Sequence, residues 1–138
     1  MCGFIGVASR KNMNNTFIED ADKFLICRGP DDQKWSENSL DKCKTLFSFH
    51  RLSIIDLSSE ASQPMSSEKY NTEILFNGEI YNHIELRKEM ESSGIKFSTS
   101  HSDTETLLLG LSEYGNKFIE KVDGQFSVVL LNKNNNTI

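Results

Sequence analysis

Apolar residues recur along the chain with two spacings, one typical of strands and the other of helices. Short apolar runs and alternating patterns predict strands, or pairs of strands, in residues 2–9, 45–56, 72–82 and 124–138. The last of these segments includes an asparagine-rich turn and the start of a return strand. Apolar residues three or four positions apart predict helices at residues 16–27, 83–94 and 102–115. Residues 58–71 are polar and predict a loop.

Capping signals mark the ends of the predicted helices. Ser102 or Asp103 is the expected N-cap of the third helix, because a short polar side chain can accept the first unpaired backbone N–H groups. Gly94 and Gly115 are expected to end the second and third helices, since glycine readily adopts positive φ. The apolar face of the second helix is expected to contain Ile84, Leu86 and Met90.

The order of these elements predicts the fold class. Strands and helices occur in blocks, and hairpin-like turns such as Asn77-Gly78 separate the strands. This pattern favours an α+β fold with antiparallel sheets over a doubly wound parallel sheet. The sequence stops where FSVVLL (126–131) would have an unpaired edge, so we expect a fragment of a longer protein. A clean monomer that melts like an ordinary intact domain would argue against this expectation.

Composition narrows the class of protein further. The chain has 138 residues, of which 37% are hydrophobic and 25% charged, which suits one globular domain. Its net charge of -5 disfavours binding to nucleic acid or to an anionic membrane. The sequence has no secretory signal and no membrane-spanning run, so we expect a cytoplasmic protein. Cys2, Cys27 and Cys43 form no CxxC pair and the histidines lie far apart, so neither a disulfide framework nor a metal site is expected.

Cys2 is a candidate nucleophile because of its place directly after the initiator methionine. Removal of Met1, which a small second residue favours, would put a thiol and an α-amino group on one residue. The amino group has an ordinary pKa of about 7.7–8.0, so it could act as the base that converts the thiol to the thiolate. The alternative is that Cys2 is only a small buried residue at the start of a strand.

Four other residues could complete a site around Cys2. Asn77 and Gly78 offer a side-chain amide and a backbone N–H for an oxyanion, although the pair could equally form a plain turn. Arg51 could bind a carboxylate or form a surface ion pair. Asp103 could bind an ammonium group or cap a helix. Together the groups complement an α-amino acid with a side-chain amide, which indicates glutamine or asparagine as substrate.

The chain resembles the class II glutamine amidotransferases, and within them the glutaminase domain of the asparagine synthetase branch. The similarity runs from Met1 to about Asn132 in family order. The motifs that carry it are MCGFIG (1–6), RGPDD (28–32), FHRLSIIDLS (49–58), QP (63–64), FNGEIYN (76–82), SDTE (102–105) and DGQFSVVLLN (123–132).

This resemblance implies an N-terminal-nucleophile fold, an αββα sandwich of four layers with two antiparallel sheets between helices. It implies that Cys2 forms a γ-glutamyl thioester and that Asn77 and Gly78 form the oxyanion hole. Arg51 would bind the glutamine α-carboxylate, and Asp103 and Glu79 would lie at its α-amino group. The backbone that would line the same pocket is that of Arg51, Leu52, Ser53, Ile54 and Ile55.

The resemblance also implies that residues 1–138 form an incomplete glutaminase domain without the synthetase domain. The expected partners are L-glutamine and an ammonia-accepting synthetase domain that binds ATP and Mg²⁺, and a homodimer remains open. This chain itself is expected to need no cofactor. The family usually has histidine before RGPD, where this chain has Cys27, a position expected to be structural.

Several functions therefore remain open. The first is hydrolysis of glutamine to glutamate and ammonia, which supplies ATP-dependent asparagine synthesis in the parent protein. The same domain could instead serve amidation of a sugar or of another carboxylate acceptor. It could also be a glutamine-binding module without catalysis, either because the domain is truncated or because Met1 is retained. A small α+β domain with chance motifs is a further alternative.

Overall fold

The computed structural model describes residues 2–11, 16–52 and 62–138. Its strands are β1 (Gly3–Ser9), β2 (Asp32–Ser39), β3 (Lys44–Arg51), β4 (Met65–Ser67), β5 (Thr72–Ile80) and β6 (Gly124–Asn132). Its helices are α1 (Thr16–Asp22), α2 (His83–Ser92), α3 (Asp103–Tyr114) and the 3-10 helix η2 (Gly115–Lys121).

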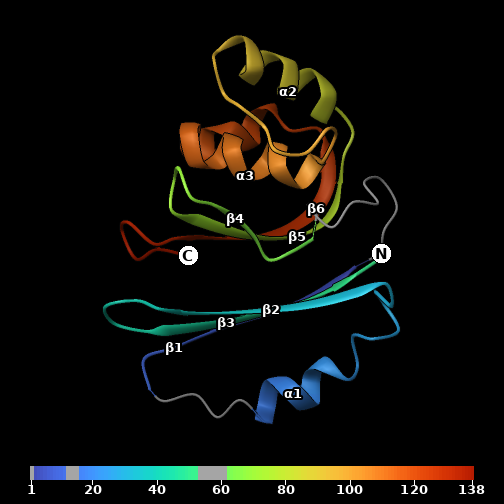
Figure 1. Cartoon of the computed structure of the whole chain (residues 1–138), viewed down its shortest axis with the longest axis vertical. Helices are drawn as coiled ribbons and strands as arrows, with labels where there is room; N and C mark the ends of the chain where they lie inside the picture. Colours follow the sequence, from blue (N-terminus) through green and yellow to red (C-terminus); the bar gives the residue numbers. More distant parts are fainter. Residues whose placement is uncertain (1, 12–15, 53–61) are drawn as a thin grey trace.

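The strands form two antiparallel three-stranded sheets that face each other. The strand orders are β1-β3-β2 and β4-β5-β6. Helix α1 covers the outer face of the first sheet, while α3 covers the outer face of the second sheet and α2 lies beyond it (Figure 1). The α+β class and the αββα arrangement expected from the sequence are therefore confirmed.

Two apolar clusters hold the layers together. The cluster between the two sheets contains Phe47, Phe49, Leu75 and Leu131, each at most 1% exposed. Cys2 packs against this cluster at its border. The larger cluster joins the second sheet to the two helices above it. Its fully buried residues include Ile74, Ile80, Met90, Leu107 and Leu108.

Strand β2 was not predicted, because its sequence, DQKWSENS, is polar. Two of its inward positions are nevertheless paired with a buried carboxylate. Ser36 Oγ donates to Glu73 of the opposite sheet, and Asn38 Nδ2 donates to the same oxygen at 3.0 Å. Hydrogen bonds across the sandwich therefore replace the apolar alternation that predicts a strand. The short strand β4 also falls within a segment predicted to be a loop.

Helix α1 is shorter than predicted. It ends at Asp22 instead of residue 27, and turns follow in which Phe24 N donates to Ala21 O at 3.1 Å. Phe24 is 80% exposed, so its side chain does not extend the helix's buried face. Asp22 is 5% exposed, and its carboxylate lies 2.9 Å from His50 Nε2 on the sheet. A buried contact between Asp22 and His50 thus attaches the end of this helix to the sheet.

The predicted turn at Asn77-Gly78 is wrong. Strand β5 continues through both residues to Ile80, with Gly78 opposite Phe126 of β6. A Cβ added at Gly78 would lie 2.2 Å from Gln125 O, so the close approach of β6 requires glycine here. The turn follows at Tyr81 and Asn82 and leads into α2.

The predicted ends of the second and third helices are confirmed, whereas one predicted core residue is wrong. Gly94 and Gly115 have φ values of +88° and +66°. Ser102 is the N-cap of α3 and accepts the Glu105 backbone N–H. Leu86 and Met90 are buried as predicted, but Ile84 is 51% exposed. Ile84 lies in the first turn of α2, where its side chain is not covered.

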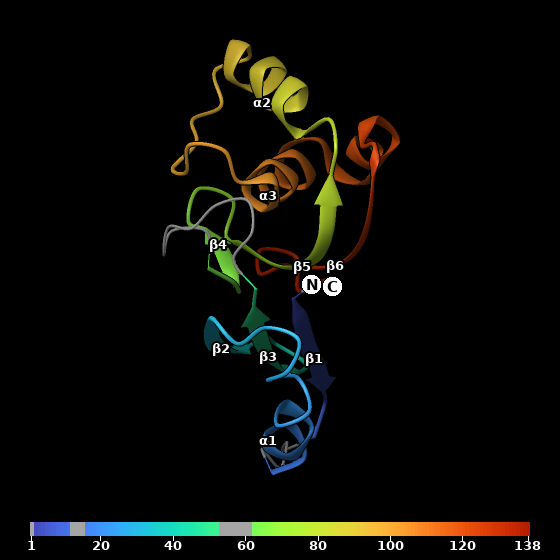
Figure 2. The same cartoon turned by 90° about the vertical axis from the view of Figure 1, so that its right-hand side faces the viewer.

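The sandwich brings three chain segments to one end. These are the start of β1, the end of β3 and the end of β5, which lie toward the right-hand side of Figure 1, the side that faces the viewer in Figure 2. Gly3 pairs with His50 between β1 and β3, which places Cys2 beside the end of β3. Strand β6 lies at the edge of its sheet, and the predicted return strand appears as one bridge, Asn132 with Thr137.

Candidate active site

Cys2 lies at the junction between β1 and the residue after β3. Its side chain is half-buried, and its Sγ accepts the Leu52 backbone N–H at 3.3 Å. The same Sγ lies 3.5 Å from Leu52 O, to which the thiol donates. Arg28 Nε donates to Cys2 O at 3.2 Å. Main-chain and side-chain contacts therefore hold the cysteine in one place at the end of the sandwich.

Arg51 ends β3 and is 7% exposed. Its Nη1 donates to Ser62 Oγ at 3.3 Å, and Ser62 Oγ donates to Asp32 Oδ2 at 2.6 Å. The hydrogen bond from Ser62 holds the pKa of Asp32 below its ordinary value, and the nearby Arg51 charge adds to this effect. The guanidinium therefore belongs to a series of hydrogen bonds that connects β3 with β2 and with the segment before β4.

Asn77, Gly78 and Glu79 occupy the last part of β5. Asn77 is half-buried, whereas Gly78 and Glu79 are exposed. Asp103, the first residue of α3, joins this part of the strand to the helix. Its Oδ2 accepts the Ile80 backbone N–H at 3.3 Å, and its Oδ1 accepts that of Thr104 at 2.7 Å. The strand end and the helix start thus form one unit.

Burial raises the pKa of the Asp103 carboxyl above its ordinary value of 3.8. The two backbone N–H groups and the nearby His83 oppose this shift, while Glu79 adds to it. A buried carboxylate with a raised pKa is costly to keep charged, so its charge needs a partner. An ammonium group bound beside it would supply that partner.

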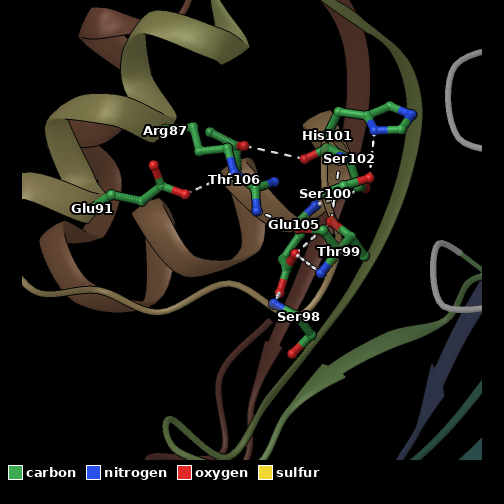
Figure 3. A network of polar contacts seen from close by, with 9 residues as sticks. All are labelled: Arg87, Glu91, Ser98, Thr99, Ser100, His101, Ser102, Glu105 and Thr106. Carbon is green, nitrogen blue, oxygen red and sulfur yellow. Dashed lines mark hydrogen bonds and ion pairs between the residues drawn. The ribbon is translucent and has the colours of Figure 1, made fainter.

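The segment before α3 is held by Glu105 (Figure 3). The buried Glu105 carboxylate accepts the backbone N–H groups of Ser98 and Thr99 at 2.6 and 2.8 Å, and the Thr99 hydroxyl at 2.5 Å. Arg87 of α2 donates to the Thr99 carbonyl from the other side. This network fixes the loop that leads to Asp103, and it explains why the SDTE motif ends in glutamate.

The predicted site residues form two groups, one on each sheet. Cys2, Arg51 and Leu52 lie at one end of the first sheet, while Asn77, Gly78, Glu79 and Asp103 belong to the second sheet and its helix. Ser53, Ile54 and Ile55 lie outside the described residues. Cys27 is exposed, and its Sγ donates to Phe24 O at 3.4 Å.

Three further residues belong to this region and were not predicted from the sequence, namely Asp32, Ser62 and Gln63. Asp32 and Ser62 continue the series of hydrogen bonds from Arg51, and Gln63 contacts both β5 and α3. The RGPDD and QP motifs contain two of them and could have indicated their importance. Within residues 2–11, 16–52 and 62–138, no group of three or more His, Cys, Asp or Glu side chains could hold a metal ion.

The family model for the glutamine amidotransferase domain matches residues 1–138. The chain belongs to this family. It is similar to asparagine synthetase [glutamine-hydrolyzing] 1 of Bacillus subtilis, with 38% identity over 143 residues that cover 100% of this chain and 22% of that protein.

Another relative comes from a plant. Asparagine synthetase [glutamine-hydrolyzing] 2 of Oryza sativa is 36% identical over 135 residues, which cover 95% of this chain and 21% of that protein. The chain therefore spans about a fifth of the length of the curated relatives it matches. In the described part of the chain, no helix combines the length and apolarity needed to cross a bilayer.

Proposed function

We propose that the chain hydrolyses the side-chain amide of L-glutamine to glutamate and ammonia, with Cys2 as the nucleophile. One observation carries the proposal. In a domain of the glutamine amidotransferase family, Cys2 Sγ accepts the Leu52 N–H at 3.3 Å, directly beside the buried Arg51. The contacts with Leu52 hold the sulfur next to the residue that is proposed to bind the glutamine α-carboxylate.

The proposed reaction begins after removal of Met1. The α-amino group of Cys2 takes the thiol proton, and the thiolate forms a bond to the side-chain carbonyl carbon of glutamine. Asn77 and Gly78 donate hydrogen bonds to the resulting oxyanion. Collapse breaks the carbon–nitrogen bond, and ammonia leaves with the proton from the amino group. Water then hydrolyses the γ-glutamyl thioester, which releases glutamate and restores the thiol.

Labelling by 6-diazo-5-oxo-L-norleucine tests this proposal. The diazo carbon of this glutamine mimic takes up a proton and then loses N₂ as the thiolate bonds to it, so the mimic reports an assembled site. We expect one adduct on a chain that lacks Met1, located at Cys2 by peptide mapping and suppressed by L-glutamine. A chain that loses Met1 but gains no adduct, measured by intact mass, would contradict the proposal.

Arg51→Ala is expected to weaken glutamine binding. A hydrogen bond to a charged group contributes about 1.5–3 kcal/mol, so KM should rise about 10- to 100-fold. Arg51→Lys keeps the charge and controls for the loss of the cation beside Asp32. Steady-state kinetics with L-glutamine measure both variants. A fall in kcat with unchanged KM would contradict the role of Arg51 at the α-carboxylate.

Asp103 is expected to make glutamine binding depend on pH. Its ionised form binds the substrate ammonium, and its pKa is raised above 3.8 by burial. As the pH falls through this raised pKa, the carboxylate becomes neutral and KM rises. The rise should therefore begin at a higher pH than for an ordinary aspartate.

Asp103→Asn is the control for this pH dependence. The variant should have a KM for glutamine that is high at neutral pH and nearly constant over the same range. KM measured as a function of pH in both proteins makes the comparison. A wild-type KM that does not change with pH would show that the Asp103 carboxylate does not bind the substrate ammonium.

The whole protein is proposed to use the ammonia for asparagine synthesis. The relatives that match the complete chain are named as glutamine-hydrolysing asparagine synthetases, which supports this assignment. A synthetase domain that binds ATP and Mg²⁺ would then be the partner. Asparagine formation from aspartate, ATP and glutamine by the complete protein tests it.

We also propose that the protein acts in the cytoplasm. Cys2, Cys27 and Cys43 are all unpaired, as expected where thiols stay reduced. A homodimer and the lack of a nucleic-acid partner stay predictions from the sequence. Fractionation and the mass of the protein in solution test the location and the dimer.

A further inference from the structure

We propose that Ser62 and Gln63 act as a clamp that fixes the spacing between the two halves of the glutamine site, with Gln63 as a positioning residue. The inference rests on the proposed function, because it takes Arg51 as the carboxylate-binding group and Asn77 and Asp103 as the other half. Neither Ser62 nor Gln63 has a role in the reaction as proposed above.

Ser62 makes the contact to the first half of the site. It is 6% exposed, and its hydroxyl accepts from Arg51 Nη1 at 3.3 Å. The same hydroxyl donates to Asp32 Oδ2 at 2.6 Å. A change in the position of Ser62 would therefore change the position of the guanidinium.

Gln63 makes the contacts to the second half. It is 5% exposed, and its side-chain amide pairs with both backbone groups of Phe76. Phe76 N donates to Gln63 Oε1 at 2.6 Å, and Gln63 Nε2 donates to Phe76 O at 3.0 Å. Nε2 also lies 3.3 Å from Thr104 Oγ1, to which it donates. One side chain thus contacts the residue before Asn77 and the residue after Asp103.

The strand pairing explains why an amide is needed at this position. Strand β4 pairs with β5 only as far as Met65 opposite Ile74. Two residues further along β5, the Gln63 side chain takes the place of a backbone partner for Phe76. The Phe76 backbone needs both an acceptor and a donor as partners. An amide offers both, whereas an ionised carboxylate offers only acceptors. The conformation of β5 just before Asn77 therefore depends on this side chain.

The spacing matters because glutamine must contact both halves of the site at once. Its α-carboxylate and its amide are joined by a short carbon chain, whereas Arg51 and Asn77 lie on different sheets. A displacement of about 1 Å at a reacting group can slow a reaction about 100-fold. Consecutive residues bonded to both halves are well suited to hold that distance constant.

The test compares alkylation of Cys2 by two reagents in the full chain. The glutamine mimic 6-diazo-5-oxo-L-norleucine needs both halves of the site, whereas iodoacetamide needs only the thiolate. Gln63→Met removes the amide bonds and keeps most of the volume. We expect it to slow alkylation by the mimic about 10- to 100-fold, with the iodoacetamide rate within about twofold of wild type.

The chain offers a matched pair of milder variants. Thr104→Val removes the hydroxyl that Gln63 contacts. Thr72→Val removes the hydroxyl of another buried threonine, which lies 2.7 Å from Ser112 Oγ and joins the same strand and helix at their far ends. Each variant loses one hydrogen bond, so we expect similar losses in melting temperature, with alkylation by the mimic about threefold slower in Thr104→Val and unchanged in Thr72→Val.

These outcomes separate the two proposals. If the mimic labels Cys2 in the wild type but Gln63→Met and Thr104→Val behave like Thr72→Val, the clamp is wrong and the proposed function stands. If Gln63→Met does not fold, the threonine pair alone decides in the same way. If the wild type is not labelled, the proposed function fails and the clamp fails with it.

Discussion

Cys2→Ala is expected to lose at least about a thousandfold in glutaminase activity, because no other group on the chain is proposed to bond to the substrate carbon. The side chain is small and lies at the border of the apolar cluster between the sheets. Its removal should therefore lower the free energy of unfolding by no more than about 1 kcal/mol. Glutamate release and a denaturant titration measure the two effects.

Cys27→Ala and Cys43→Ala provide matched controls for this result. Both cysteines are unpaired, so the controls change the same chemical group without breaking a disulfide. We expect both variants to keep wild-type activity. Activity that survives in Cys2→Ala, or that disappears in Cys27→Ala, would show that Cys2 is not the nucleophile.

The fold class could be predicted because its apolar segments follow simple rules. Strand β3 could be predicted from its closely spaced apolar residues Leu46, Phe47 and Phe49, although polar residues of the same strand are buried as well. Strand β2 could not be found in this way, since Ser36 and Asn38 are satisfied by Glu73 from the other sheet. A tertiary hydrogen bond leaves no periodic signal in the local sequence.

The Asn77-Gly78 pair shows a second limit of local patterns. The pair is typical of tight turns, yet here it lies within β5. The glycine is required because β6 passes so close that a Cβ would lie 2.2 Å from Gln125 O. A glycine here could therefore serve a tight turn or make room for a neighbouring strand. Only the position of β6 distinguishes the two.

The candidate site could be predicted in part. Arg51, Asn77 and Asp103 carry groups whose chemistry complements glutamine, and Cys2 was suggested by its place directly after Met1. Gln63 acts on none of these groups directly and bonds instead to backbone atoms of Phe76. Such a contact depends on two segments that meet only in the folded chain.

Asn77→Ala is expected to lower kcat about 10²- to 10³-fold, the usual effect of removing one oxyanion donor, with little change in KM. The side-chain amide is proposed to bind the oxyanion more strongly than the ground-state carbonyl, so its loss affects mainly the transition state. Asn77 is half-buried and faces Ser127 across the sheet, so the variant should fold. Steady-state kinetics with L-glutamine measure the effect.

The control for Asn77→Ala must be a second substitution of Asn77 itself and not a substitution of the neighbouring Gly78. Gly78→Ala would force β5 and β6 apart, so its loss of activity would not distinguish a missing donor from a distorted strand. Asn77→Asp keeps the size and removes the donor, and its negative charge would repel the oxyanion. We therefore expect it to be at least as slow as Asn77→Ala. A kcat for Asn77→Asp close to that of the wild type would show that Asn77 does not donate to the oxyanion.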